Sequence, residues 1–138
     1  MAQASADDLL RDAAARHGRG DLALAERLYH RVLKLRPGDA NALNLLGVVA
    51  RQRGALAEAL AYSAQAVMAQ PNSPAFLASR GAALAEAGRL PEAVAALRAA
   101  LAVRPDDAVT LRNLGQALCA LGDAPAALAP LRLSLIHI

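Results

Sequence analysis

The chain has 138 residues, of which 37 are alanine and 25 are leucine, and its only aromatic residues are Tyr29, Tyr62 and Phe76. Alanine and leucine are strong helix formers, whereas strands favour β-branched and aromatic residues, so the composition predicts an all-α fold and argues against a sheet. The net charge of +3 comes from 15 basic and 12 acidic residues that alternate along the chain. This pattern lacks the basic cluster of a nucleic-acid-binding protein.

The location of the protein is predicted from its apolar runs and its cysteine. No apolar run reaches the roughly 18 residues of a membrane span. Asp7 and Asp8 stand where a signal peptide would carry basic residues. Cys119 is the single cysteine and cannot form an internal disulfide, which fits a reducing compartment. We therefore expect a cytoplasmic protein that binds neither nucleic acid nor membrane.

The first predicted helix pair lies in Ala6–Asp39, which holds 7 basic and 6 acidic residues. Such a polar exterior suits the end of an array of helix pairs.

The second helix pair shows its boundaries most clearly. Apolar residues at helical spacing predict one helix over about Ala40–Arg53 and another over about Leu56–Gln70. Gly54 stands just past the first helix, where a left-handed residue is wanted, and Pro71 stops the second. The segment Ala40–Ser73 is therefore predicted to be a helical hairpin.

The third and fourth helix pairs lie in Pro74–Asp107 and in 108–138. Pro91 and Pro125 fall in the first turn of the second helix of each pair, where a missing N–H costs little. Pro130 is expected to interrupt the last helix, and the tail that follows it, Leu133–Ile138, departs from the pattern of the earlier pairs.

All four segments share a period of about 34 residues, and a period of this length indicates tandem structural repeats. It appears in four independent series: Pro37, Pro71 and Pro105; Gly20, Gly54, Gly88 and Gly122; Gly47, Gly81 and Gly115; Ala25, Ala59, Ala93 and Ala127. The small pairs Gly47 with Ala59 and Gly81 with Ala93 predict a close approach of the two helices within a repeat.

These repeats resemble the tetratricopeptide repeat (TPR) family over about Ala6 to Leu133. The matching residues in the second repeat are Leu43, Leu46, Gly47, Gly54, Ala59, Ala66 and Pro71. Those in the third are Leu77, Gly81, Leu84, Gly88, Ala93, Leu97, Ala100 and Pro105. Those in the fourth are Leu111, Leu114, Gly115, Leu118, Gly122, Ala127 and Leu131, and the first repeat is more divergent. The resemblance implies one TPR domain over residues 1–138, with repeats 6–39, 40–73, 74–107 and 108–138. These would stack into a right-handed α-α superhelix, a solenoid of antiparallel helix pairs whose first helices line a concave groove.

Catalytic chemistry is not indicated. His17 and His30 are well separated in the sequence, and no His, Cys, Asp or Glu set has metal-ligand spacing. The glycines are separated rather than grouped as a phosphate-binding loop, and no serine has the strand–turn–helix context of a nucleophile. Cys119 lies on an Ala/Leu-rich helix, where a buried and inert thiol is expected. We expect no enzyme activity, no catalytic residue, no metal and no cofactor.

The function class that remains after catalysis is excluded is the recognition of another protein. The resemblance places these residues of the first helices along the groove: Asp7, Leu10, Ala14 and His17; Asn41, Asn44, Val48 and Arg51; Ala75, Ala78, Ala82 and Ala85; Val109, Arg112, Gln116 and Cys119. The alanines are expected to be merely solvated or packed helix residues. Six side chains that can form hydrogen bonds are the predicted protein-binding residues: Asn41, Asn44, Arg51, Arg112, Asn113 and Gln116.

Two functions follow from the resemblance. The first is a protein-interaction scaffold that binds a peptide or helix of a partner in the groove. The second is the N-terminal TPR arm of a larger bacterial enzyme, because glycosyltransferases, sulfotransferases and methyltransferases with such arms begin with a stretch like Arg16-His17-Gly18. The fourth repeat is rich in leucine and holds only three charged residues, Arg112, Asp123 and Arg132. It therefore predicts a homodimer through this C-terminal repeat.

Overall fold

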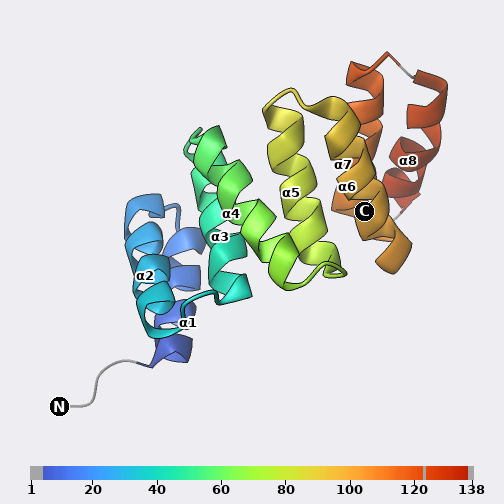
Figure 1. Ribbon diagram of the computed structural model, residues 1–138. Helices are drawn as coiled ribbons and strands as arrows, with labels where there is room; N and C mark the ends of the chain where they lie inside the picture. Colours follow the sequence, from blue (N-terminus) through green and yellow to red (C-terminus); the bar gives the residue numbers. More distant parts are fainter. Residues whose placement is uncertain (1–4, 123, 137–138) are drawn as a thin grey trace. The chain divides into compact units, whose positions relative to one another are not determined.

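In the part described by the computed structural model (residues 5–122 and 124–136), the chain forms eight helices and no strand. The helices follow one another in antiparallel pairs joined by short turns (Figure 1). Their bounds are α1 Ala6–Gly18, α2 Leu22–Leu35, α3 Ala40–Gln52, α4 Leu56–Ala69, α5 Pro74–Glu86, α6 Leu90–Val103, α7 Ala108–Ala120 and α8 Ala124–Ile136. The all-α prediction is confirmed, and the predicted ends of α3 and α4 are correct to within one residue.

Local chemistry explains where the helices begin and end. The side chains of Ser5, Asp21, Asp39 and Ser73 each accept a hydrogen bond from a backbone N–H in the first turn of the helix that follows. At the other end of α3, Gly54 has φ +81°, a conformation that favours glycine. These signals depend on a few neighbouring residues, which is why the sequence predicts the boundaries so closely.

The chain divides into two compact halves, Met1–Ala69 and Gln70–Ile138, and each half is described by itself. In the N-terminal half α1 packs on α2, α2 on α3, and α3 on α4. Its core joins Leu9 of α1, Tyr29 and Val32 of α2, and Leu46 and Val49 of α3. A single helix pair thus shares its apolar face with the next one.

In the C-terminal half α6 packs against both α5 and α7, and α7 packs against α8. The core here joins Val94 and Leu97 of α6 to Leu114 and Leu118 of α7. Gly81 of α5 lies so close to α6 that an added Cβ would stand 2.7 Å from Leu97 Cγ. The predicted close approach of the paired helices is therefore present, with the Leu97 side chain as the nearest neighbour.

The last helix differs from its prediction. Pro130 does not interrupt α8, which continues to Ile136. Leu131, one residue later, packs on the core of the C-terminal half, and this packing holds the helix where proline alone would weaken it. Residues 137–138 of the predicted tail lie outside the described residues.

Candidate functional site

The candidate residues of the N-terminal half lie on α3. Asn41 is exposed, Asn44 is 8% exposed and Arg51 is half-buried. The amide oxygen of Asn44 is buried and accepts no hydrogen bond within the described part of the chain. An unpaired buried acceptor is costly, so Asn44 needs a partner that the described residues do not supply. Because Asn44 is buried and Asn41 is exposed, the three candidate residues of α3 are not equally accessible to a partner.

One contact joins α1 to α3 at the same end of these helices. His17 Nε2 lies 2.7 Å from Gln52 Oε1, and the His17 ring meets the Tyr29 ring edge-on with 6.3 Å between centroids. Gln52 was not predicted as a site residue from the sequence, because it is distant from His17 along the chain. The signal that could have found it is the repeat itself, since residues about one period apart fall at the same level of neighbouring repeats.

Tyr29 lies at the centre of the N-terminal half. Its side chain is fully buried, and its hydroxyl has no hydrogen-bond partner among the described residues. Burial raises the pKa of the Tyr29 phenol. The phenol therefore stays neutral, and Tyr29 contributes to the core through the packing of its ring.

The candidate residues of the C-terminal half lie on α7. Arg112 and Gln116 are exposed, whereas Asn113 is half-buried. Arg112 and Gln116 are one turn apart and so share a face, and Asn113 is turned from Arg112 by about 100°. The structure therefore brings Arg112 and Gln116 together and sets Asn113 at the edge of their face.

Helix α5 contacts α7 as well as α6. Four alanines run along α5 at the predicted groove positions, and none of them is fully buried: Ala75, Ala78, Ala82 and Ala85. On α7, Val109 is 53% exposed one turn before Arg112. The two helices thus carry small, apolar and hydrogen-bonding side chains within one half of the molecule.

The prediction of a buried Cys119 is wrong, because the thiol is exposed. The buried face of α7 carries Leu111, Leu114 and Leu118. Cys119 is one residue on from Leu118 and is therefore turned away from the core by about 100°. Its exposure agrees with the groove position that the resemblance implied.

The described residues hold no group of three or more His, Cys, Asp or Glu side chains that could bind a metal ion. His30 is exposed and lies 4.0 Å from Glu26 one turn away on α2. Among the helices that the structure describes, none is both long and apolar enough to cross a membrane.

Comparisons with known proteins agree with this architecture. Residues 10–74 match the family described as Tetratricopeptide repeat, and residues 81–122 match that described as TPR repeat. The solved structure of MamA 41-end from Desulfovibrio magneticus RS-1 is similar, with TM-score 0.85 and 22% identity over 96% of this chain and 75% of that chain. MamA MSR-1 C2 is similar with TM-score 0.77 and 20% identity over 97% of this chain and 77% of that chain. A search of curated proteins finds no match.

Proposed function

Because this chain belongs to the tetratricopeptide repeat family of all-α solenoid scaffolds for protein interaction, we propose that it binds a peptide or helix of a partner protein on the first helix of each repeat. The observation that carries the proposal is the face formed by α5 and α7. Arg112 and Gln116 are exposed there and make no hydrogen bond or ion pair with the described residues. Their donors and acceptors are available to a partner.

The chemistry of this face favours an extended segment. Small residues along α5 allow a peptide backbone to approach closely. Gln116 can both donate to and accept from that backbone, and the Arg112 guanidinium can bind a carboxylate in two parallel hydrogen bonds. Val109 adds an exposed apolar contact. We therefore propose that the bound segment carries an acidic residue next to a small apolar one.

The α3 face of the N-terminal half is a second part of the proposal. Asn41 is exposed and Asn44 holds an unpaired buried acceptor. Together with Arg51, these residues supply hydrogen bonds of the kind that bind a peptide main chain. Asn113 belongs to the same set on α7 but lies at the edge of the face.

A peptide selection tests this proposal. Phage-displayed unstructured peptides are selected on the chain, and each enriched peptide is then measured against Arg112→Ala, Gln116→Ala and the control Arg98→Ala. Arg98 is exposed on α6, outside the proposed face. We expect about tenfold weaker binding with each α7 variant and no change with Arg98→Ala. Equal losses in all three variants, or no enrichment over an unrelated helical protein, would refute the proposed face.

Self-association through the last repeat is a separate part of the proposal. Leu128 and Leu135 of α8 are large and apolar, are 58% and 72% exposed, and lie two turns apart on one side of the helix. In a two-fold dimer, an apolar patch of this kind is covered by the same patch of the second chain. We propose the cytoplasm as the compartment, because the single exposed thiol of Cys119 suits a reducing environment.

A further inference from the structure

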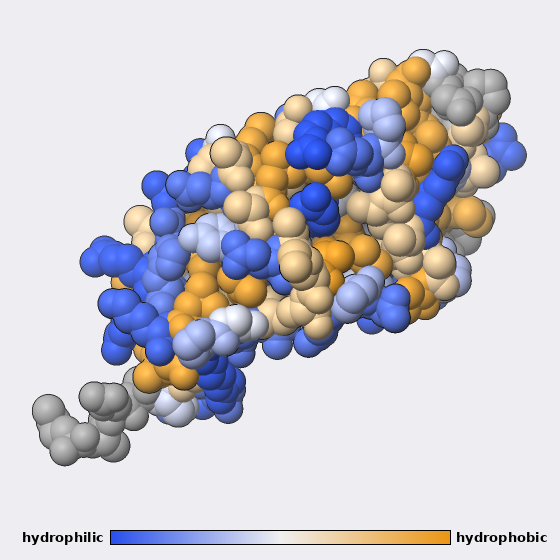
Figure 2. Space-filling view, in the orientation of Figure 1, coloured by the Kyte–Doolittle hydropathy of each residue, from blue (hydrophilic) through white to orange (hydrophobic). Residues whose placement is uncertain are grey.

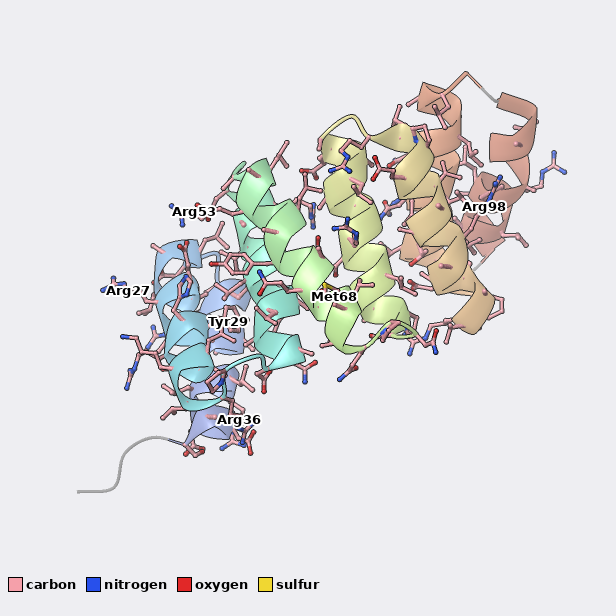
Figure 3. All side chains as sticks on the ribbon, viewed as in Figure 1. Arg27, Tyr29, Arg36, Arg53, Met68 and Arg98 are labelled. Atoms are coloured by element: carbon pink, nitrogen blue, oxygen red, sulfur yellow. The ribbon has the colours of Figure 1, made fainter. Side chains whose placement is uncertain are left out.

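Three basic residues form a stripe along the outward face of α2. Arg27, Arg31 and Lys34 are all exposed. Their spacing of four and then three positions places them on one side of the helix, over about 10 Å of its length. Arg27 extends from α2 away from the neighbouring helices (Figure 3), and hydrophilic side chains project along this edge of the N-terminal half (Figure 2). We call these three residues the α2 basic stripe.

The cations of the α2 basic stripe make no ion pair with any residue that the structure describes. The nearby carboxylates are engaged elsewhere: Glu26 with Arg53, Asp7 with Arg36, Asp8 with Arg11, Asp12 with Arg16, and Asp21 as the cap of α2. Like charges one helical turn apart repel one another. The stripe is therefore a local excess of positive charge that carboxylates from outside the chain would relieve.

The fold does not require these charges. The equivalent positions one repeat later are Ala61, Gln65 and Met68 on α4, and those two repeats later are Ala95, Ala99 and Ala102 on α6. All six are exposed, as the stripe is. Equivalent outward positions in two other repeats thus carry neutral side chains, whereas α2 carries three cations.

Apolar residues border the stripe on one side. Leu35 is 50% exposed at the end of α2, and Leu24 is half-buried two turns before Arg31. Leu24, Arg31 and Leu35 are spaced by whole helical turns, so the three form one ridge. A mixed face of cations and leucine complements a surface on which acidic and apolar residues alternate in the same way.

From this charge complementarity we infer that the α2 basic stripe docks an acidic amphipathic helix of a partner protein. Carboxylates spaced i, i+4 and i+7 on the partner would match the three cations, and an apolar residue beside them would cover Leu35. An anionic membrane fits less well, because polybasic segments that bind lipid carry about four to eight cations. This surface is separate from the α3 and α7 faces.

A designed peptide tests the inference. The probe is a fluorescein-labelled alanine-rich helix with glutamate at i, i+4 and i+7 and leucine beside them, and its comparator has glutamine at the three positions. Binding to the chain is followed by fluorescence anisotropy. The test variant is Arg27→Ala/Arg31→Ala/Lys34→Ala. The control is Arg98→Ala/Arg104→Ala/Arg132→Ala, which removes three other exposed cations and equally lowers the net charge from +3 to 0.

We expect the glutamate peptide to bind more tightly than the glutamine peptide, and binding to weaken about tenfold in the α2 variant but not in the control. The α2 variant should stay folded, because the equivalent positions are all alanine on α6 and all neutral on α4; circular dichroism checks this. No binding of the glutamate peptide, or equal losses in both variants, would overturn the inference. Vesicles of phosphatidylserine and phosphatidylcholine form the third arm. Stripe-dependent binding to them without peptide binding would assign the stripe to membranes and reject the helix.

Discussion

The hydroxyl of Tyr29 is a buried polar atom without a partner among the described residues, and its removal should not harm the protein. The side chain is 0% exposed, and a buried hydroxyl without a hydrogen bond costs roughly 1–3 kcal/mol. We therefore expect Tyr29→Phe to raise the free energy of unfolding by about 1 kcal/mol. Urea unfolding followed by circular dichroism measures this, with Tyr62→Phe as the control because Tyr62 is only half-buried. A loss of stability in Tyr29→Phe would show that the hydroxyl has a partner, such as a buried water.

The reactivity of Cys119 distinguishes the structure from the sequence-based prediction. An exposed thiol reacts with a maleimide without any opening of the fold, whereas a buried thiol must wait for unfolding. We expect native Cys119 to react at a rate similar to that of the chain in concentrated urea. The rate is followed by mass spectrometry. Strong protection in the native state would mean that another surface covers α7.

At the scale of the helix pair, two glycines at equivalent positions should respond differently to alanine. A Cβ on Gly81 would stand 2.7 Å from Leu97, which is fully buried, whereas a Cβ on Gly47 would find its nearest neighbour at 3.4 Å. Overpacking costs typically about 1–3 kcal/mol, whereas alanine in place of a helical glycine gains about 1 kcal/mol. We expect Gly81→Ala to lower the midpoint of thermal unfolding and Gly47→Ala to keep or raise it. Equal effects of the two changes would contradict the close approach of α5 to α6.

The first turn of α1 should make the protein sensitive to acid. Hydrogen bonding to Ser5, first through its side chain and then through its backbone, lowers the pKa of Asp8 below 3.8, with a smaller contribution from Arg11. A carboxylate with a lowered pKa stabilises the fold above its unfolded pKa, and this contribution is lost as the pH falls through the folded value. We therefore expect the stability gap between the wild type and Asp8→Asn to close below about pH 4. Unfolding curves along a pH series measure the gap, and a constant gap would show that the hydrogen bonds between Ser5 and the Asp8 carboxylate are not its cause.

At the scale of the whole molecule, the exposed leucines of α8 should control self-association. Leu128 and Leu135 lie one repeat after Val94 and Leu101, which pack with the α7 side chains of the core. The same kind of surface on α8 is 58% and 72% exposed at these two leucines. We expect a dimer in light scattering, and a monomer when both leucines are changed to lysine. A monomeric wild-type chain at tens of micromolar would contradict the dimer.

The sequence by itself determined the repeats, the boundaries of the second helix pair and the family. The regular repeat period, the glycines that end helices and the capping side chains are local signals, and each depends on a few consecutive residues. Four repetitions of one pattern also reveal the fold, because a single helix pair cannot bury its own apolar face.

Only the tertiary structure decided how individual side chains are used. It exposes Cys119, buries Asn44 and joins His17 to Gln52, and it carries α8 through Pro130. It also shows that the α2 basic stripe has no described ion-pair partner, although Glu26 and Asp39 flank the stripe in the sequence. These features depend on which side of a helix meets its neighbour and on contacts between distant residues. The helix propensity of a short segment does not determine such contacts. They are determined by the packing of the helices against one another.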